Sequence, residues 1–160
     1  MILPGKAWLA VVIVLGFIGA PSALADTRES ASGSGQERTA ILKMLNAQVT
    51  AWNHGELEGF MAGYWHSPEL TFFSNDNETH GWQETLERYK TRYQGEGRAM
   101  GKLDFQDLRI EMLDTKAAFV RGKWHLKMPD GKDLQGMFTL VLRKFPQDGW
   151  KIVHDHSSGT

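Results

Sequence analysis

Two histidines near the carboxyl end of the chain carry side chains suited to acid–base chemistry. The turn residues Asp148-Gly149 precede a run in which Trp150, Ile152, His154 and His156 occupy every second position. Because side chains alternate between the two faces of a strand, both imidazoles are expected on the face that carries the two apolar residues. An unperturbed imidazole titrates near pH ~6.5, so His154 and His156 are candidate catalytic acids or bases.

The same pair of histidines also fits other interpretations. The two imidazoles could be structural, bonded to backbone or to the hydroxyls of Tyr64 and Tyr93. A zinc site would need three or four protein ligands, and His66 or His80 could supply one, although no spacing places them there. The functional and structural interpretations remain open, and neither a metal site nor a cofactor is predicted.

Asp155 lies between the two histidines in sequence and is expected on the opposite face of their strand. There it would pair with a basic residue on a neighbouring strand, such as Arg121 or Arg143. Asp155 would be catalytic only if the predicted facing of this strand is wrong. Asp104 and Glu111 likewise alternate away from their apolar neighbours. With no carboxyl expected on an inner face, the sequence argues against isomerase chemistry that uses a carboxylate base inside an apolar pocket.

Aromatic side chains from the helices and the strands are expected to line a pocket beside the histidines. Such a lining suits an apolar or aromatic ligand, and buried tyrosine hydroxyls would be its polar points. Arg88 is a candidate to bind an acidic ligand group through two hydrogen bonds, or else a solvated helix residue. The predicted ligand-binding residues are Trp52, Tyr64, Phe72, Arg88, Tyr89, Tyr93, Trp124 and Phe138.

Three helices are expected to form one wall of this pocket. Apolar residues at helical spacing predict a helix over residues 41–52, ended by Asn53-His54-Gly55. A shorter helix is expected over residues 57–64. A third is expected over residues 82–93, with Gly81 as its cap.

Long strands follow the helices. From Leu103 onward the apolar residues alternate, and turns are expected at Pro129-Asp130-Gly131 and over residues 146–149. The alternation changes phase near Gln106-Asp107, which predicts a β-bulge that bends the sheet. This order predicts an α+β fold in which a curved antiparallel sheet wraps the N-terminal helices on its concave face.

Residues 1–25 are predicted to be a secretory signal peptide. The uncharged apolar run over residues 7–18 is shorter than the roughly 20 residues that span a bilayer, and Ala23-Leu24-Ala25 is a cleavage motif. We expect a periplasmic or secreted bacterial protein with residues 26–36 as a flexible tether and residues 37–158 as the folded domain. The intact mass of the exported protein tests cleavage after Ala25.

The composition limits the partners that the protein could bind. The chain has 160 residues, enough for one domain, and no cysteine, so no disulfide supports its core. It carries 18 Lys and Arg against 19 Asp and Glu, a net charge of −1. This balance favours neither nucleic acid nor an anionic membrane surface as a partner. Met137, Val141 and Val153 are expected on outer faces of the strands, where an apolar patch would form a sheet-to-sheet homodimer.

The order of elements and several segments resemble the nuclear transport factor 2-like superfamily, and more narrowly its secreted SnoaL-like domains. The resemblance covers roughly residues 37–158. It implies a conical half-barrel with a deep pocket, often in a homodimer, and a superfamily that includes ketosteroid isomerase, polyketide cyclases and dehydratases. The segments that carry it are residues 52–56, 64–72, 88–93, 136–140 and 149–157; the last is also similar to the end of the association domain of calcium/calmodulin-dependent protein kinase II.

Two functions are therefore expected from different classes. In the first, the pocket binds a small, largely apolar molecule and His154 or His156 performs acid–base chemistry of the isomerase, cyclase or dehydratase type. In the second, the domain is a non-catalytic homodimerisation module. Whether the two histidines reach an open cavity distinguishes them.

Overall fold

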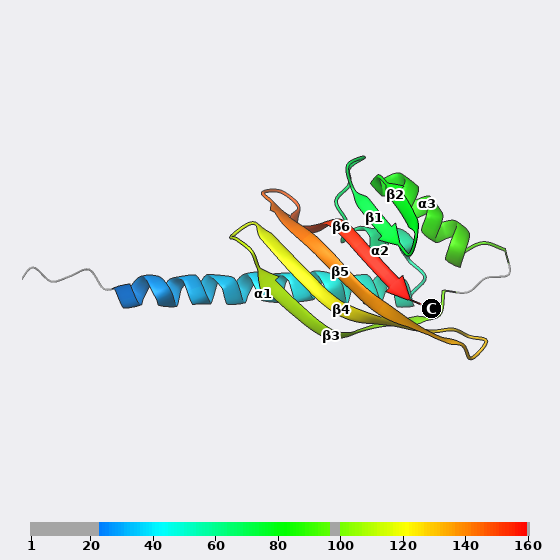
Figure 1. Ribbon diagram of the computed structural model, residues 1–160, viewed down its shortest axis with the longest axis horizontal. Helices are drawn as coiled ribbons and strands as arrows, with labels where there is room; N and C mark the ends of the chain where they lie inside the picture. Colours follow the sequence, from blue (N-terminus) through cyan, green and yellow to red (C-terminus); the bar gives the residue numbers. More distant parts are fainter. Residues whose placement is uncertain (1–22, 97–99, 160) are drawn as a thin grey trace, which may run out of the picture.

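The computed structural model describes residues 23–96 and 100–159, and Figure 1 shows helices followed by a sheet of long strands. The predicted α+β class is confirmed. Most of the predicted signal peptide, residues 1–22, lies outside the described residues. None of the described helices contains a segment long and apolar enough to cross a bilayer. The elements are α1 (Ala23–Asn53), α2 (Leu57–Met61), β1 (Thr71–Ser74), β2 (Asn77–His80), α3 (Trp82–Tyr93), β3 (Lys102–Met112), β4 (Ala117–Lys127), β5 (Asp133–Phe145) and β6 (Gly149–Gly159).

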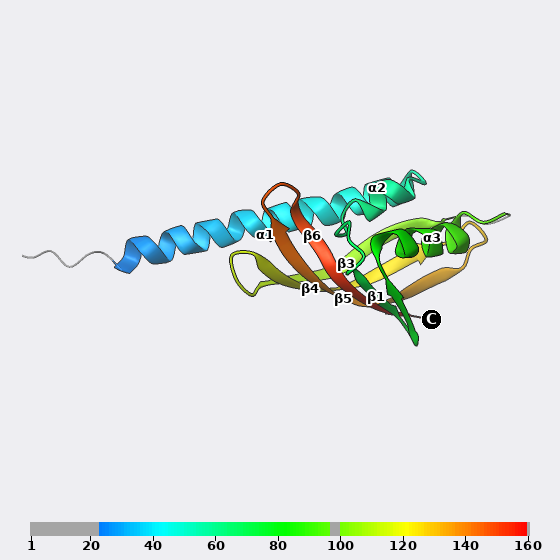
Figure 2. The ribbon, with the colours of Figure 1, turned by 90° about the horizontal axis from the view of Figure 1, so that it is seen from above.

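The six strands form one open, curved sheet in the order β2-β1-β6-β5-β4-β3. Neighbouring strands are antiparallel except β1 and β6, which run parallel with Thr71 opposite His154. The sheet is thus mixed, whereas the sequence predicted an antiparallel one. The difference arises because β1, which follows α2 in the chain, pairs in parallel with the edge of β6 that β5 leaves free. Figure 2 shows α1 and α2 along one side of this sheet.

Two β-bulges bend the long strands. The pairing of β3 with β4 shifts register between Gln106 and Arg109, which confirms the predicted bulge. A second bulge lies in β6, where Val141 of β5 pairs with His154 and Leu142 pairs with Ile152. Val153 is therefore an extra residue with no partner in the ladder. An inserted residue reverses which face of the strand each later side chain occupies.

The predicted apolar face of α1 packs into the core. Ile41, Leu45, Gln48 and Trp52 are all buried. The helix ends at Asn53, as predicted, and Gly55 has a positive φ of 80° that favours glycine at this position. Since α1 and α2 are joined by this short turn, they form a helical hairpin.

Residues 26–36 are helical and do not form the flexible tether expected from their composition. Figure 1 shows α1 running unbroken from Ala23 to Asn53 and projecting beyond the sheet. The segment has no proline, and its two glycines disfavour a helix by only about 1 kcal/mol each. Glu37 then fixes α1 to the β5–β6 hairpin, accepting hydrogen bonds from Lys144 Nζ at 2.6 Å and from Trp150 Nε1 at 2.7 Å. The bonds from Lys144 and Trp150 lower the pKa of Glu37.

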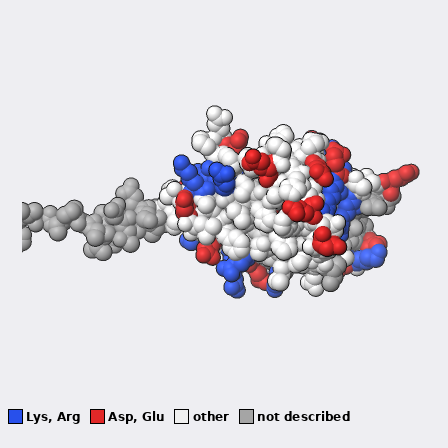
Figure 3. All heavy atoms as spheres, turned by 45° about the horizontal axis from the view of Figure 1, so that its top comes forward, with Lys and Arg blue, Asp and Glu red and all other residues white. Residues whose placement is uncertain are grey.

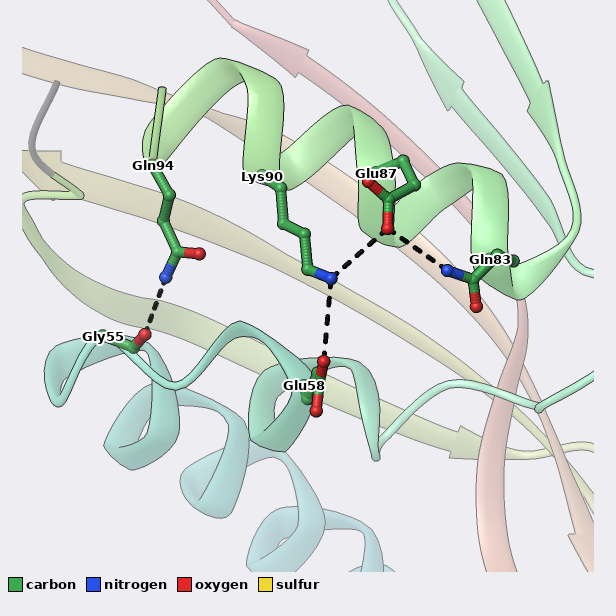
Figure 4. A network of polar contacts seen from close by, with 6 residues as sticks. All are labelled: Gly55, Glu58, Gln83, Glu87, Lys90 and Gln94. Atoms are coloured by element: carbon green, nitrogen blue, oxygen red, sulfur yellow. Dashed lines mark hydrogen bonds and ion pairs between the residues drawn. The ribbon is translucent and has the colours of Figure 1, made fainter. Parts of the chain in front are cut away.

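Helix α3 is held against the α1–α2 hairpin by polar contacts on its outer side (Figure 4). Lys90 Nζ lies 3.3 Å from Glu87 and 3.6 Å from Glu58 of α2, and Gln94 Nε2 donates to the carbonyl oxygen of Gly55 at 2.8 Å. Exposed ion pairs of this kind contribute little stability. The inward side of α3 instead packs through Tyr89 and Tyr93, whose rings contact Trp52 of α1.

Candidate functional site

A cavity of about 160 Å³ lies between the helices and the inner face of the sheet. Aromatic rings form much of its wall: Trp52 meets Tyr93 with ring centroids 4.8 Å apart, and Phe60 meets Tyr89 at 5.4 Å. Both pairs are edge-to-face contacts, a favourable geometry for aromatic rings. All eight residues predicted to bind ligand line this cavity, which confirms their position; their role in binding remains a prediction.

The sheet supplies the opposite wall of the cavity. Phe138 of β5 and Trp124 of β4 point inward, and Gly122 pairs with Phe138 across the two strands. A Cβ atom at Gly122 would lie 2.7 Å from the Phe138 ring, so only glycine leaves room for that ring. The indole nitrogen of Trp124 donates to the carbonyl oxygen of Ser158 at 3.1 Å and ties β4 to the end of β6.

Strand β6 presents Asp155, and not the two histidines, to the cavity. Asp155 lines the cavity and is 4% exposed, whereas His154 and His156 do not line it. The predicted facing was wrong because the bulge at Val153 reverses the alternation after Ile152. On its other edge, Ile152 is held by backbone hydrogen bonds with Gly63 and Trp65, both 2.9 Å long.

The two histidines lie on the outer face of the sheet. His154 Nδ1 is 2.6 Å from Thr71 Oγ1, and its ring stands edge-on to Phe73 with centroids 4.9 Å apart. Partial burial and the neighbouring His156 lower the pKa of His154. His156 is exposed. Neither imidazole would therefore contact a ligand bound in the cavity.

The expected ion pair between Asp155 and a back-facing arginine is also absent from the described residues. Arg121 lies 3.6 Å from Glu111, on the outer face. Asp155 instead accepts two hydrogen bonds inside the cavity, from the Tyr64 hydroxyl to Oδ2 and from the Ser157 hydroxyl to Oδ1, each 2.8 Å long. Both donors are neutral hydroxyl groups, so the carboxylate is stabilised by hydrogen bonds and not by a positive charge.

Burial controls the ionisation of Asp155. Removal from water raises the pKa of this carboxyl to about 6, while the hydrogen bonds from Tyr64 and Ser157 oppose the rise. A carboxyl with this pKa exchanges protons readily near neutral pH. The sequence offered little sign that Asp155 would face the cavity. The consecutive apolar residues Ile152-Val153 are the one local mark consistent with a bulge.

Three tyrosines line the cavity together with Asp155, as predicted for the polar points of the pocket, and Tyr64 bonds to the carboxyl directly. Burial raises the pKa of Tyr64 and of Tyr89 well above the usual value, and the charge of Asp155 raises both further. Burial also raises the pKa of Tyr93, against the opposing effect of Arg92 and Arg88. The three phenols therefore remain neutral hydrogen-bond donors at physiological pH.

The residues considered as metal ligands do not converge. His80 Nε2 lies 2.7 Å from Glu78, and the ring of His66 packs against Trp82 with centroids 4.3 Å apart. Within residues 23–96 and 100–159, no group of three or more His, Asp or Glu side chains is placed to hold a metal ion.

Known proteins with similar sequences and structures share this fold. The family model described as SnoaL-like domain matches residues 41–160. No protein with a curated description matches the chain. The structure of a nuclear transport factor 2-like protein of unknown function from Shewanella oneidensis is 40% identical, with a TM-score of 0.68 over 74% of this chain and 95% of that chain. A nuclear transport factor 2-like superfamily protein from Salmonella enterica is 23% identical, with a TM-score of 0.68 over 79% of this chain and 92% of that one.

Proposed function

This chain belongs to the SnoaL-like domain family, and from that premise we propose that its cavity binds a small, largely apolar molecule and exchanges a proton with it through Asp155. The observation that carries the proposal is a buried carboxyl, with a pKa raised to about 6, in the wall of an aromatic cavity. Asp155 takes the role that sequence reasoning assigned to His154 and His156.

The size of the cavity supports a ligand of about one ring. An apolar protein cavity of about 150 Å³ binds benzene, and this one has about 160 Å³. Aromatic side chains form much of the cavity wall, and the hydroxyl groups of Tyr64, Tyr89 and Tyr93 are among its polar groups. A ligand with a carbonyl or hydroxyl group would satisfy both kinds of surface.

Proton transfer is the chemistry that Asp155 supports. As a carboxylate it removes a proton from a carbon beside a carbonyl, and as a carboxylic acid it returns that proton or protonates a leaving hydroxyl. A neutral Tyr93 in the same cavity wall can donate a hydrogen bond to a ligand oxygen and stabilise negative charge that develops there. Isomerase, cyclase and dehydratase reactions share these steps, so the proposal names proton transfer and leaves the net reaction open.

Deuterium exchange tests this proposal with a model ligand. Cyclohexanone is of the right size, and its α-protons exchange with D₂O when a base removes them. We expect the wild-type protein to accelerate this exchange, followed by NMR, by about 10²-fold or more over Asp155→Asn. Asp148→Asn, at an exposed turn position, is the matched control and should behave as wild type. Binding without exchange would contradict proton transfer, and absence of binding by any ring-sized neutral compound would contradict the proposal itself.

A homodimerisation module is the second candidate, favoured by the outer face of the sheet. Met137 is 63% exposed there, and α1 and α2 lie on the opposite side in Figure 2. Val141, four residues along the same strand and therefore on the same face, is partly exposed, and neighbouring apolar side chains on an outer face are typical of an interface. We expect light scattering at micromolar concentration to report twice the chain mass for wild type. For Met137→Asp, we expect the measured mass to fall toward that of a single chain. A monomeric wild-type protein would rule out this candidate.

The proposed location is the periplasm or the extracellular space. It is supported by the apolar run over residues 7–18 and the cleavage motif that ends at Ala25. The face shown in Figure 3 carries both Lys or Arg and Asp or Glu side chains.

A further inference from the structure

Arg88 places a positive charge in the wall of the cavity. It belongs to α3, is half-buried and lines the cavity next to Tyr89. Its Nη1 donates to Thr79 Oγ1 at 2.8 Å, and its guanidinium carbon lies 5.5 Å from the centre of the Phe72 ring. These contacts hold the guanidinium plane between α3 and the β1–β2 edge of the sheet.

The charge of Arg88 has no carboxylate partner among the described residues, whose ion pairs all involve other cations. Thr79 is neutral and occupies only one of the five N–H donors of the guanidinium. A partly buried charge without a counter-ion is costly, and an anionic ligand would reduce that cost.

A second arginine strengthens the positive field. Arg92 is one helical turn further along α3, also lines the cavity, and has its guanidinium carbon 5.5 Å from the Tyr93 ring. Both arginines lower the pKa of Tyr93, which shows that their charge acts on groups in the cavity wall. The cavity lining thus contains two cations and a single acidic residue, Asp155.

From this arrangement we infer that the ligand is a ring-sized carboxylic acid whose carboxylate binds Arg88. The planar guanidinium matches the two oxygens of a carboxylate. The apolar body would then lie against the aromatic wall, where Asp155 acts on it. This inference rests on the proposed function, because it specifies the substrate class of the same cavity.

Benzoate and benzamide form a matched pair of probes for this inference, since they share a shape and differ in charge. Affinities are measured by calorimetry at pH 7.5 and low salt. We expect wild type to bind benzoate about tenfold or more tighter than benzamide, because hydrogen bonds to charged groups are the strong ones. Arg88→Gln should weaken benzoate by about tenfold or more and leave benzamide within about twofold. Arg38→Gln, at an exposed position of α1, is the matched control and should leave both affinities unchanged.

A further variant and the benzamide measurements distinguish failure of this inference from failure of the proposed function. Arg88→Lys keeps the positive charge but lacks the planar guanidinium group. Its affinity for benzoate should therefore lie between those of wild type and Arg88→Gln. Equal losses of benzoate and benzamide in Arg88→Gln would mean a packing defect and would overturn the inference. Benzamide bound as tightly as benzoate by wild type would overturn it while leaving the proposed apolar cavity intact. If neither compound binds, both proposals fail together.

Discussion

Asp155→Asn is expected to stabilise the protein at pH 7.5 by about 3 kcal/mol. The carboxyl has a pKa of about 6 in the folded protein against 3.8 as the reference value, and each unit of difference corresponds to about 1.4 kcal/mol. Asparagine has the same shape and an oxygen that accepts the Tyr64 hydrogen bond, but it carries no charge to desolvate. Wild type thus carries a cost at this position that is consistent with a functional role.

The pH dependence gives this prediction its sign. Below pH 3.8 the carboxyl is protonated in both the folded and the unfolded protein, so its favourable contribution is fully present and the two proteins should be similarly stable. As the pH rises toward 6, the unfolded chain releases the proton first, and wild type loses stability relative to Asp155→Asn. Above about pH 6 the difference should stay constant.

Urea unfolding of both proteins between pH 4 and 7.5 measures this difference. Asp148→Asn serves as the control and should show no such pH-dependent gain. A variant that is less stable than wild type at pH 7.5 would contradict the prediction, because it would mean that the folded protein favours the carboxylate.

Tyr64→Phe is expected to destabilise the protein by about 1–3 kcal/mol at pH 7.5. The phenol donates to Oδ2 of Asp155 at 2.8 Å, and its loss leaves a buried carboxylate with one hydrogen bond fewer. That hydrogen bond lowers the pKa of Asp155, so the variant should raise the pKa of this carboxyl further. The destabilisation should be smaller at pH 4.5, where Asp155 is protonated and neutral.

Urea unfolding at the two pH values and a carbon-13 NMR titration of Asp155 test this expectation. Tyr93→Phe is the matched control, since no hydrogen bond joins Tyr93 to Asp155, and it should leave the titration nearly unchanged. In an Asp155→Asn background, Tyr64→Phe should cost less than in wild type. Equal costs at both pH values and in both backgrounds would show that the tyrosine acts through packing alone.

Local sequence patterns determined most of the fold. Helical spacing of apolar residues located α3, and Gly55 and Gly81 located the end of α1 and the start of α3. In β3, the change of phase between Leu103 and Leu108 predicted the bulge, because apolar residues lie on both sides of it. The aromatic lining of the cavity followed from the same patterns, since large rings on inner faces have few other places to pack.

Tertiary structure alone decided which side chain of β6 faces the cavity. The bulge at Val153 arises where β6 pairs with β5 on one side and with Gly63 and Trp65 on the other, all distant in sequence. The adjacent apolar pair Ile152-Val153 is the one local mark of this bulge, because no apolar residue follows Val153 to reveal the change of phase. The pairing of β6 turns the histidines outward and buries Asp155. Burial then raises the pKa of that carboxyl, because the ionised group loses its hydration only in the folded protein.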